Sequence, residues 1–202
     1  APAPPPSEAA PAAPAPWVAS LAVVRPAAGE SPRRGLGWGL HMGVLAEVGL
    51  LPGPSLGPRV ALALHRANWS LELAGALLLP RHAELRGGTA PSSDIDWLAG
   101  QLALCRGFGQ HLNACAGVEA GRLSGTGSGV DEPATARGGW LAATAEARLH
   151  GDLFGSGTLS WQLGLGVAAA LSRPEFGFEE LGVLHRPSAA SARLFVGLGW
   201  GR

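Results

Sequence analysis

The stretch TLSWQLGLGVAAALSR at residues 158–173 alternates large apolar side chains with small or polar ones over almost its whole length. A period of two predicts a β-strand, because successive side chains of a strand point to opposite faces of a sheet. In a soluble sheet the face with the large residues would pack in a core. In a membrane barrel the same face would contact lipid. The rest of the chain has to distinguish these two cases. The large residues of this stretch are Leu159, Trp161, Leu163, Leu165, Val167, Ala169 and Leu171.

The composition gives a first indication of lipid. Charged residues make up 15% of the 202 residues, whereas an ordinary soluble domain has about 25%. So few charges leave little to cover a water-facing surface. The 15 basic and 15 acidic residues balance, so the charge gives no argument for a nucleic-acid partner. No stretch is long and apolar enough for a transmembrane helix, which leaves a closed barrel as the way to satisfy the backbone in a bilayer.

The chain divides into three parts. Residues 1–16 are almost entirely Pro and Ala, which predicts a disordered, polyproline-prone arm. Residues 17–35 form a connecting segment with a short apolar run that could be an extra strand. Residues 36–202 carry the repeated alternation of a β-domain. Its eight predicted strands lie at 36–50, 57–66, 69–79, 95–105, 112–123, 140–150, 158–173 and 192–202.

The connections between these strands alternate in length. The turns RAN, RGFGQH and GDLFGS are short, whereas the connections around 80–94, 123–139 and 172–191 are long. Long loops at one end and short turns at the other are typical of outer-membrane barrels, whose long loops face outside. The sequence therefore predicts an all-β, eight-stranded antiparallel up-and-down barrel.

The ionisable residues of the strands indicate which face is inside. Most of them lie on the same face as the small residues. That face has too few polar side chains and too many glycines to be a water-exposed exterior. Small side chains suit the narrow interior of an eight-stranded barrel, which side chains fill. We therefore expect a transmembrane barrel whose leucines face lipid, with a soluble or secreted barrel as the alternative.

In this pattern of strands and connections, and in stretches such as LCRGFGQHLNACAGVEAGRL at 104–123, the chain resembles the small outer-membrane β-barrels of the OmpA/OmpX type. It resembles still more closely the outer-membrane β-barrel proteins common in myxobacteria. The resemblance covers roughly 36–202 and rests on architecture. It implies integration into the outer membrane of a Gram-negative cell, with outer-membrane lipid and the barrel assembly machinery as partners. Barrels of this family usually end on an aromatic residue, whereas here Trp200 lies two positions before the end.

Two cysteines flank the turn around Gln110. Cys105 and Cys115 share a parity and would lie opposite one another in a hairpin. An even cysteine count in an exported protein predicts a disulfide. Two unpaired thiols are the alternative, and a zinc site that also uses His111 lacks a second pair of ligands.

The inward charges could in principle perform acid–base chemistry. A structural network is the better interpretation, because charges inside a narrow barrel are costly unless they are paired. We expect the carboxylates to be neutralised by the arginines and histidines, with Glu119 as a partner of Arg148. The predicted network consists of Glu47, Arg59, Glu72, Glu119, Glu146 and Arg148.

The remaining motifs predict no catalytic residue, cofactor or metal. SGTGSG at 124–129 lacks the lysine and the helix of a phosphate-binding loop. Five tryptophans near strand ends are typical of an aromatic girdle at the membrane interfaces. They are Trp38, Trp69, Trp97, Trp140 and Trp200.

The leading functional hypothesis is a non-enzymatic outer-membrane barrel without an open pore. Its structural or surface-interaction role would depend on the long loops at 80–94, 123–139 and 172–191. The alternatives are a lipid-modifying enzyme built on the same barrel and a soluble, lipocalin-like carrier. The sequence does not identify an external ligand.

Overall fold

A computed structural model describes residues 35–84, 92–128, 135–155, 157–178 and 182–201. The predictions for 1–16 and for nearly all of 17–35 lie outside these residues. The strands are β1 (Gly37–Val48), β2 (Ser55–Arg66), β3 (Trp69–Glu84), β4 (Ser92–Phe108), β5 (Leu112–Ser128), β6 (Thr135–Asp152), β7 (Leu159–Ser172), β8 (Phe176–Phe178), β9 (Gly182–His185) and β10 (Ala190–Gly201).

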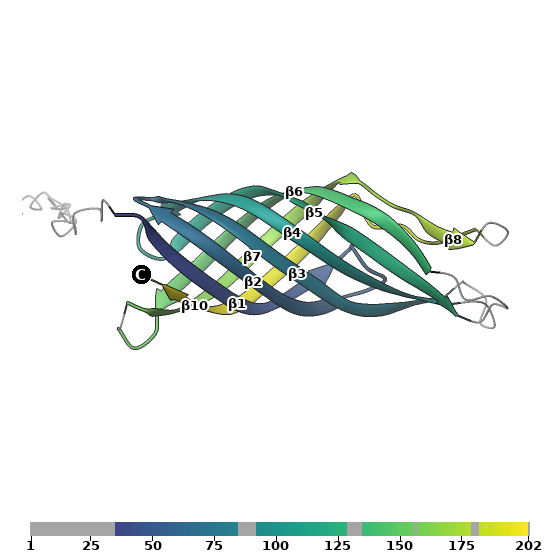
Figure 1. Cartoon of the computed structure of the whole chain (residues 1–202), viewed down its shortest axis with the longest axis horizontal. Coiled ribbons are helices and arrows are strands. Elements are labelled where there is room, and N and C mark those ends of the chain that lie inside the picture. Colours follow the sequence, from purple (N-terminus) through teal and green to yellow (C-terminus); the bar gives the residue numbers. More distant parts are fainter. Residues whose placement is uncertain (1–34, 85–91, 129–134, 156, 179–181, 202) are drawn as a thin grey trace, which may run out of the picture. The chain divides into compact units, whose positions relative to one another are not determined.

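Eight of these strands form a closed antiparallel barrel, in which each strand pairs with the barrel strands before and after it in the sequence (Figure 1). The barrel closes where β10 pairs with β1, from Gly39 opposite Gly201 to Val48 opposite Ala192. The two remaining strands, β8 and β9, form a small hairpin in the connection between β7 and β10. The predicted eight-stranded up-and-down barrel is therefore confirmed.

The strands continue further into the long connections than the sequence predicted. β3 to β6 have 16 to 18 residues, whereas β1, β2 and β10 have 12. The loop bounds 80–94 and 123–139 were therefore wrong, and 172–191 contains the β8–β9 hairpin. The Ser, Thr and Gly residues of these stretches are typical of turns, which is why the sequence predicted loops there. In the structure they continue the pairing of neighbouring strands, as Ser93 does opposite Gly127. We call the end with the long connections the outer end, following the architecture of outer-membrane barrels.

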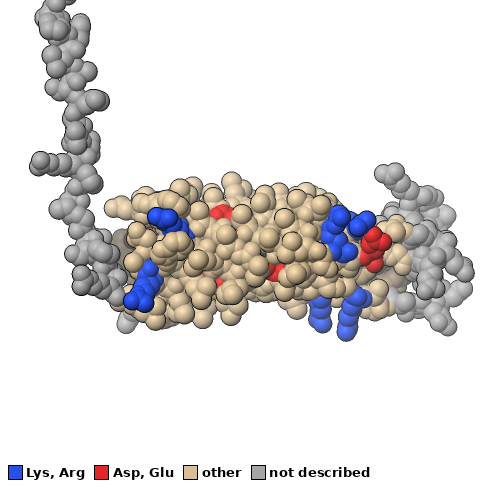
Figure 2. Space-filling view, turned by 90° about the horizontal axis from the view of Figure 1, so that it is seen from above, with Lys and Arg blue, Asp and Glu red and all other residues tan. Residues whose placement is uncertain are grey.

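The outside of the barrel is apolar around its middle. The outward residues of β6 from Leu141 to Leu149 are all Leu or Ala, and those of β5 from Leu112 to Ala120 are Leu, Ala or Val. Nine tilted residues are enough for a transmembrane strand. In Figure 2 the middle of the drawn face is almost entirely tan, and the arginines gather toward its two ends. This belt is the lipid-facing surface of a transmembrane barrel. Among the described residues, no helix is long and apolar enough to cross a bilayer.

The inside of the barrel contains an apolar cluster toward the outer end. Leu50 and Leu51, from the connection between β1 and β2, are buried in it against residues of β3 to β6 and Phe176 of β8. The cluster also contains Trp97 and Trp140, which are only 1% and 3% exposed. Their predicted place in the aromatic girdle was therefore wrong. Each has the inward parity of its strand, which outweighs its position near the strand end. The other girdle tryptophans, Trp38, Trp69 and Trp200, are exposed on the outside.

Candidate functional site

Charged residues from six strands meet inside the barrel. The strand alternation turns each of them inward, and their side chains are only 1–8% exposed. They are Glu47 of β1, Arg59 of β2, Glu72 of β3, Glu119 of β5, Glu146 and Arg148 of β6, and Arg193 of β10. Their hydrogen bonds divide them into two groups.

The first group, which we call the Arg148 cluster, contains Arg148, Arg59, Glu72 and Glu146. Arg148 Nη1 donates to Glu72 Oε2 at 2.6 Å, and Arg148 Nη2 donates to Glu146 Oε2 at 2.6 Å. Arg59 Nη2 donates to Glu72 Oε1 at 2.7 Å. Two guanidinium groups thus face two carboxylates, so the cluster is balanced in charge.

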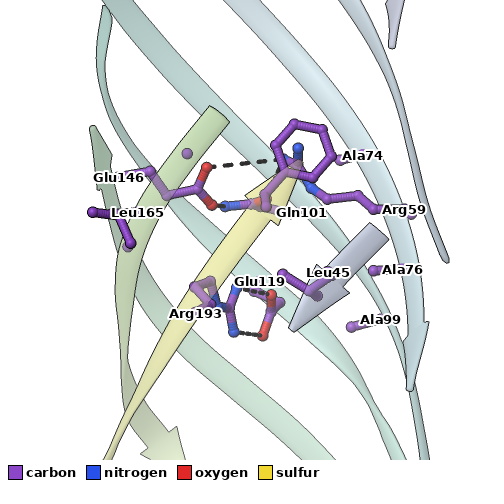
Figure 3. Close-up of a pocket in the computed structure, with 14 residues that line it drawn as sticks. Leu45, Arg59, Ala74, Ala76, Ala99, Gln101, Glu119, Glu146, Leu165 and Arg193 are labelled. Carbon is purple, nitrogen blue, oxygen red and sulfur yellow. Dashed lines mark hydrogen bonds and ion pairs between the residues drawn. The ribbon is translucent and has the colours of Figure 1, made fainter. Parts of the chain in front are cut away.

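Gln101 of β4 connects the members of the Arg148 cluster (Figure 3). Its Oε1 accepts from Arg59 Nη2 at 3.0 Å, and its Nε2 donates to Glu146 Oε1 at 2.8 Å and to Thr144 Oγ1 at 3.0 Å. An amide can do both because it carries a donor and an acceptor. The predicted network did not include Gln101, although it has the inward parity of Trp97 in the same strand.

The second group, which we call the Arg193 triad, contains Glu47, Arg193 and Glu119. Arg193 Nη1 donates to Glu119 Oε2 at 2.7 Å, and Arg193 Nη2 lies 3.1 Å from Glu47 Oε1. Trp140 Nε1 donates to Glu119 Oε1 at 2.8 Å, and Ser191 Oγ lies 2.6 Å from Glu47 Oε1. Figure 3 shows the facing side chains of Arg193 and Glu119. Here one guanidinium group serves two carboxyl groups.

All six residues predicted for the network lie inside the barrel, but the predicted partner of Arg148 was wrong. Glu119 lies opposite Ala142 on β6, six residues from Arg148. Six strand residues correspond to about 20 Å, too far for an ion pair. Sequence reasoning also missed Arg193, although it has the inward parity of Phe195 in the same strand.

The histidines do not neutralise the carboxylates as predicted. Within the described ranges, His41, His65 and His150 make no ion pair with any of the four glutamates, and the Nδ1 of the buried His41 has no hydrogen-bond partner. The three arginines fill the positions closest to the carboxylates. The described part of the chain also contains no group of three or more His, Cys, Asp or Glu residues that could hold a metal ion.

An aromatic ring packs between the charged residues and the closing strand pair. The Arg59 guanidinium carbon lies 4.7 Å from the centre of the Phe195 ring, which is within the range of a cation–π interaction. The ring covers Gly43 and Gly197, which are paired between β1 and β10. A Cβ atom on Gly197 would lie 2.7 Å from Phe195 Cζ, so glycine makes room for the ring.

The space left between the side chains is small. A cavity of about 10 Å³, lined by residues of both groups, lies beside Arg59, Arg193 and Phe195 (Figure 3). This volume suits a single water molecule. Arg59 Nη1 and Arg193 Nε have no hydrogen-bond partner among the described residues. The cavity therefore has room for one water molecule but is too small for an organic substrate.

The two cysteines are joined at the end with the short connections. Cys105 and Cys115 lie directly opposite one another in the β4–β5 pair and form a disulfide. Their side chains face inward and are buried. The predicted disulfide is therefore confirmed.

No family model matches the chain, and no curated protein matches it. Among solved structures it is similar to the major outer membrane protein of Thermus thermophilus, with a TM-score of 0.62, 15% identity, and coverage of 83% of this chain and 100% of that one. It is also similar to Ail, the attachment invasion locus protein of Yersinia pestis, solved with the heparin analogue sucrose octasulfate. That match has a TM-score of 0.55, 10% identity, and coverage of 83% of this chain and 99% of the other. The fold of this chain is that of the small outer-membrane β-barrels.

Proposed function

We propose that this protein is a closed, non-enzymatic barrel of the outer membrane with a structural and surface-interaction role. The observation that carries the proposal is the combination of an apolar belt outside and a filled interior. The belt requires lipid around the barrel, which disfavours a soluble carrier. Such a carrier would also need an interior cavity of ligand size.

Two successive layers support the absence of a pore. The Arg148 cluster and the Arg193 triad fill the interior with paired side chains. Toward the outer end, Leu50 and Leu51 fold into the barrel. Their connection is held by hydrogen bonds from His185 Nε2 to the Leu50 carbonyl and from the Ser188 amide to the Gly49 carbonyl, each 2.8 Å long.

A surface-interaction role is supported by three exposed arginines near the outer end, which we call the outer arginine cluster. They are Arg122 of β5, Arg137 of β6 and Arg173, directly after β7. Arg122 is opposite Gly139 and Arg137 is opposite Ser124, so the first two are diagonal neighbours on adjacent strands. Within the described residues, none of the three has an acidic partner.

The chemistry of this cluster fits phosphate. All 15 basic residues of the chain are arginines, and the guanidinium fork binds phosphate oxygens in pairs. The cluster lies just beyond the apolar belt, where lipid headgroups begin. We infer that it binds the phosphate groups of outer-leaflet lipid. The complex of Ail with a sulfated sugar gives a precedent for a polyanion on a barrel of this fold.

The localisation and the closed interior can be tested together. Fractionation should recover the protein in outer membranes as a band whose gel mobility changes on heating, and the purified barrel should give no steady channels in a planar bilayer. Recovery in the soluble fraction, or channels of porin size, would contradict the proposal. Incubation with lipid A should leave the mass of the lipid unchanged, whereas a changed mass would favour a lipid-modifying enzyme.

The arginine cluster needs a matched comparison. Purified lipopolysaccharide should raise the unfolding temperature of the barrel in detergent, and a dephosphorylated preparation should not. The double variant Arg122→Gln/Arg137→Gln should lose this increase. The control Arg66→Gln/Arg106→Gln, at the opposite end, should keep it. Equal responses of the two variants would contradict phosphate binding at the outer end.

A further inference from the structure

The buried charges of the interior do not balance if every group has its ordinary charge. The Arg148 cluster and the Arg193 triad together contain four glutamates and three arginines, all nearly inaccessible to water. Burying an uncompensated charge is expensive, and a titratable group usually becomes neutral instead. The interior should therefore hold one additional proton.

The imbalance lies in the Arg193 triad. The Arg148 cluster has two guanidinium groups for two carboxylates, and every one of its carboxylate oxygens accepts a hydrogen bond from Arg or Gln. In the triad, Glu47 and Glu119 share the single guanidinium of Arg193. One carboxyl group of the triad is thus without a countercharge among the described residues.

The hydrogen bonds decide which carboxyl group is neutral. Both oxygens of Glu119 face groups that can only donate, namely Trp140 Nε1 at 2.8 Å and Arg193 Nη1 at 2.7 Å. A proton on Glu119 would meet one of these donors, so Glu119 is the carboxylate. Glu47 is different, because its Oε1 lies 2.6 Å from the hydroxyl oxygen of Ser191, and a hydroxyl group can accept as well as donate.

We propose that Glu47 is a carboxylic acid in the folded barrel at neutral pH, with its proton on Oε1 and donated to Ser191 Oγ. The 2.6 Å separation is typical of an O–H···O hydrogen bond. Arg193 Nη2 lies 3.1 and 3.2 Å from the two Glu47 oxygens. Both distances are longer than the 2.7 Å bond from Arg193 Nη1 to Glu119 Oε2. The guanidinium is therefore paired with Glu119 and only contacts Glu47.

The other inward-facing charged groups do not compensate the second carboxyl group of the triad. Arg59 and Glu146 line the same cavity but belong to the balanced cluster. Arg81 faces inward at the outer end, where it is partly exposed and makes no ion pair with the glutamates within the described residues. His41 lies six residues from Glu47 on β1, so it is not beside the triad.

The proposed proton lies between the two strands that close the barrel. Glu47 is paired in register with Arg193, between the first and last strands, and Ser191 lies on β10. Loss of the proton would put two negative carboxylates against one guanidinium at the outer end of this closing pair. The barrel should therefore loosen between β1 and β10 at alkaline pH, before any arginine loses its charge.

The test is infrared spectroscopy of the barrel refolded in lipid vesicles. At neutral pH we expect a carbonyl band of a protonated carboxylic acid that Glu47→Gln removes and the control Glu175→Gln, at an exposed ion pair with Arg186, retains. Ser191→Ala should shift this band to higher frequency, because the acid loses its hydrogen-bond acceptor. A missing band in the unmodified protein, or a band that persists in Glu47→Gln, would overturn the proposal. So would an unshifted band in Ser191→Ala.

Unfolding adds an independent readout. A glutamine at position 47 can donate its amide hydrogen to Ser191 and accept from Arg193, as the neutral acid does. Glu47→Gln should therefore unfold at the same urea concentration as the unmodified barrel at neutral pH, and it should lack the decrease that we expect for the unmodified barrel at alkaline pH. A variant that keeps this alkaline decrease would contradict the proposal. If Glu47→Gln fails to refold, the Ser191→Ala spectrum still decides the assignment.

Discussion

Removal of the Arg148 side chain should be among the most destabilising single changes in the barrel. Arg148 donates hydrogen bonds to both Glu72 and Glu146, and its side chain is only 3% exposed. In Arg148→Met, Arg59 would be the only counterion of the two carboxylates among the residues that the structure describes. Removing one partner of a buried ion pair costs about 3–5 kcal/mol, because the other charge stays buried without compensation. We expect a loss in this range.

A second substitution should recover much of this loss. In Arg148→Met/Glu146→Gln, the cluster retains Glu72 and Arg59, whose ion pair measures 2.7 Å, so the charges balance again. We expect the two changes to couple by about 2–3 kcal/mol, as residues of one ion-pair network do. The control is Arg148→Met/Glu119→Gln. Glu119 is bonded to Arg193 and Trp140, so these two changes should add to within about 0.5 kcal/mol.

Equilibrium unfolding by urea in lipid vesicles measures all of these variants, with tryptophan fluorescence and heat-dependent gel mobility as two independent signals. The reasoning would be refuted if the loss in Arg148→Met/Glu146→Gln equalled the sum of the single losses. It would also be refuted if Glu119→Gln coupled to Arg148→Met as strongly as Glu146→Gln does.

Further predictions concern the exterior, the disulfide and the outer plug. Leu163→Arg should destabilise the barrel in vesicles by about 2–4 kcal/mol if this exposed position lies near the bilayer midplane, and a loss no larger than that of Leu163→Ala would contradict the lipid-facing assignment. Mass spectrometry of the unreduced protein should find no alkylatable thiol, and replacing Cys105 and Cys115 with serine should cost roughly 2–3 kcal/mol. Burial lowers the pKa of His185 below its usual value despite the hydrogen bond to the Leu50 carbonyl. As the pH falls, the His185 ring is therefore protonated in the unfolded chain before it is protonated in the folded barrel, and the free energy of unfolding should decrease below about pH 6.5. His185→Gln should make this decrease smaller. An identical pH profile in the variant would contradict a role of His185.

The barrel itself was predictable because its main constraint is local. Each strand must present alternate residues to lipid and to the interior, and this period can be read from one strand at a time. The same parity predicted that Glu47, Glu72 and Arg148 face inward, and it paired Cys105 with Cys115 across a short turn. It would also have placed Arg193 and Trp97 inside if it had been applied to every residue.

The partners inside the barrel could not be predicted in this way. Arg193 of β10 bonds to Glu119 of β5, and Arg148 of β6 bonds to Glu72 of β3. In neither bond are the two strands neighbours in the sheet. Contacts across the interior depend on the stagger between successive strands, which accumulates around a barrel. An error of two residues in one register changes which arginine meets which glutamate.

The closing pair of strands is the place where these interior contacts matter most. β1 and β10 are the first and last strands of the barrel, so their pairing joins the segments that lie farthest apart in the sequence. Glycines occupy both sides of the pair at Gly43 and Gly197, and they can contribute no side-chain packing of their own. The Phe195 ring covers them, and Glu47 with Arg193 and Ser191 joins the two strands further out. The polar interior therefore closes the barrel as well as filling it. A proton shared between Glu47 and Ser191 lets one arginine serve two carboxyl groups at this junction without burying a net charge.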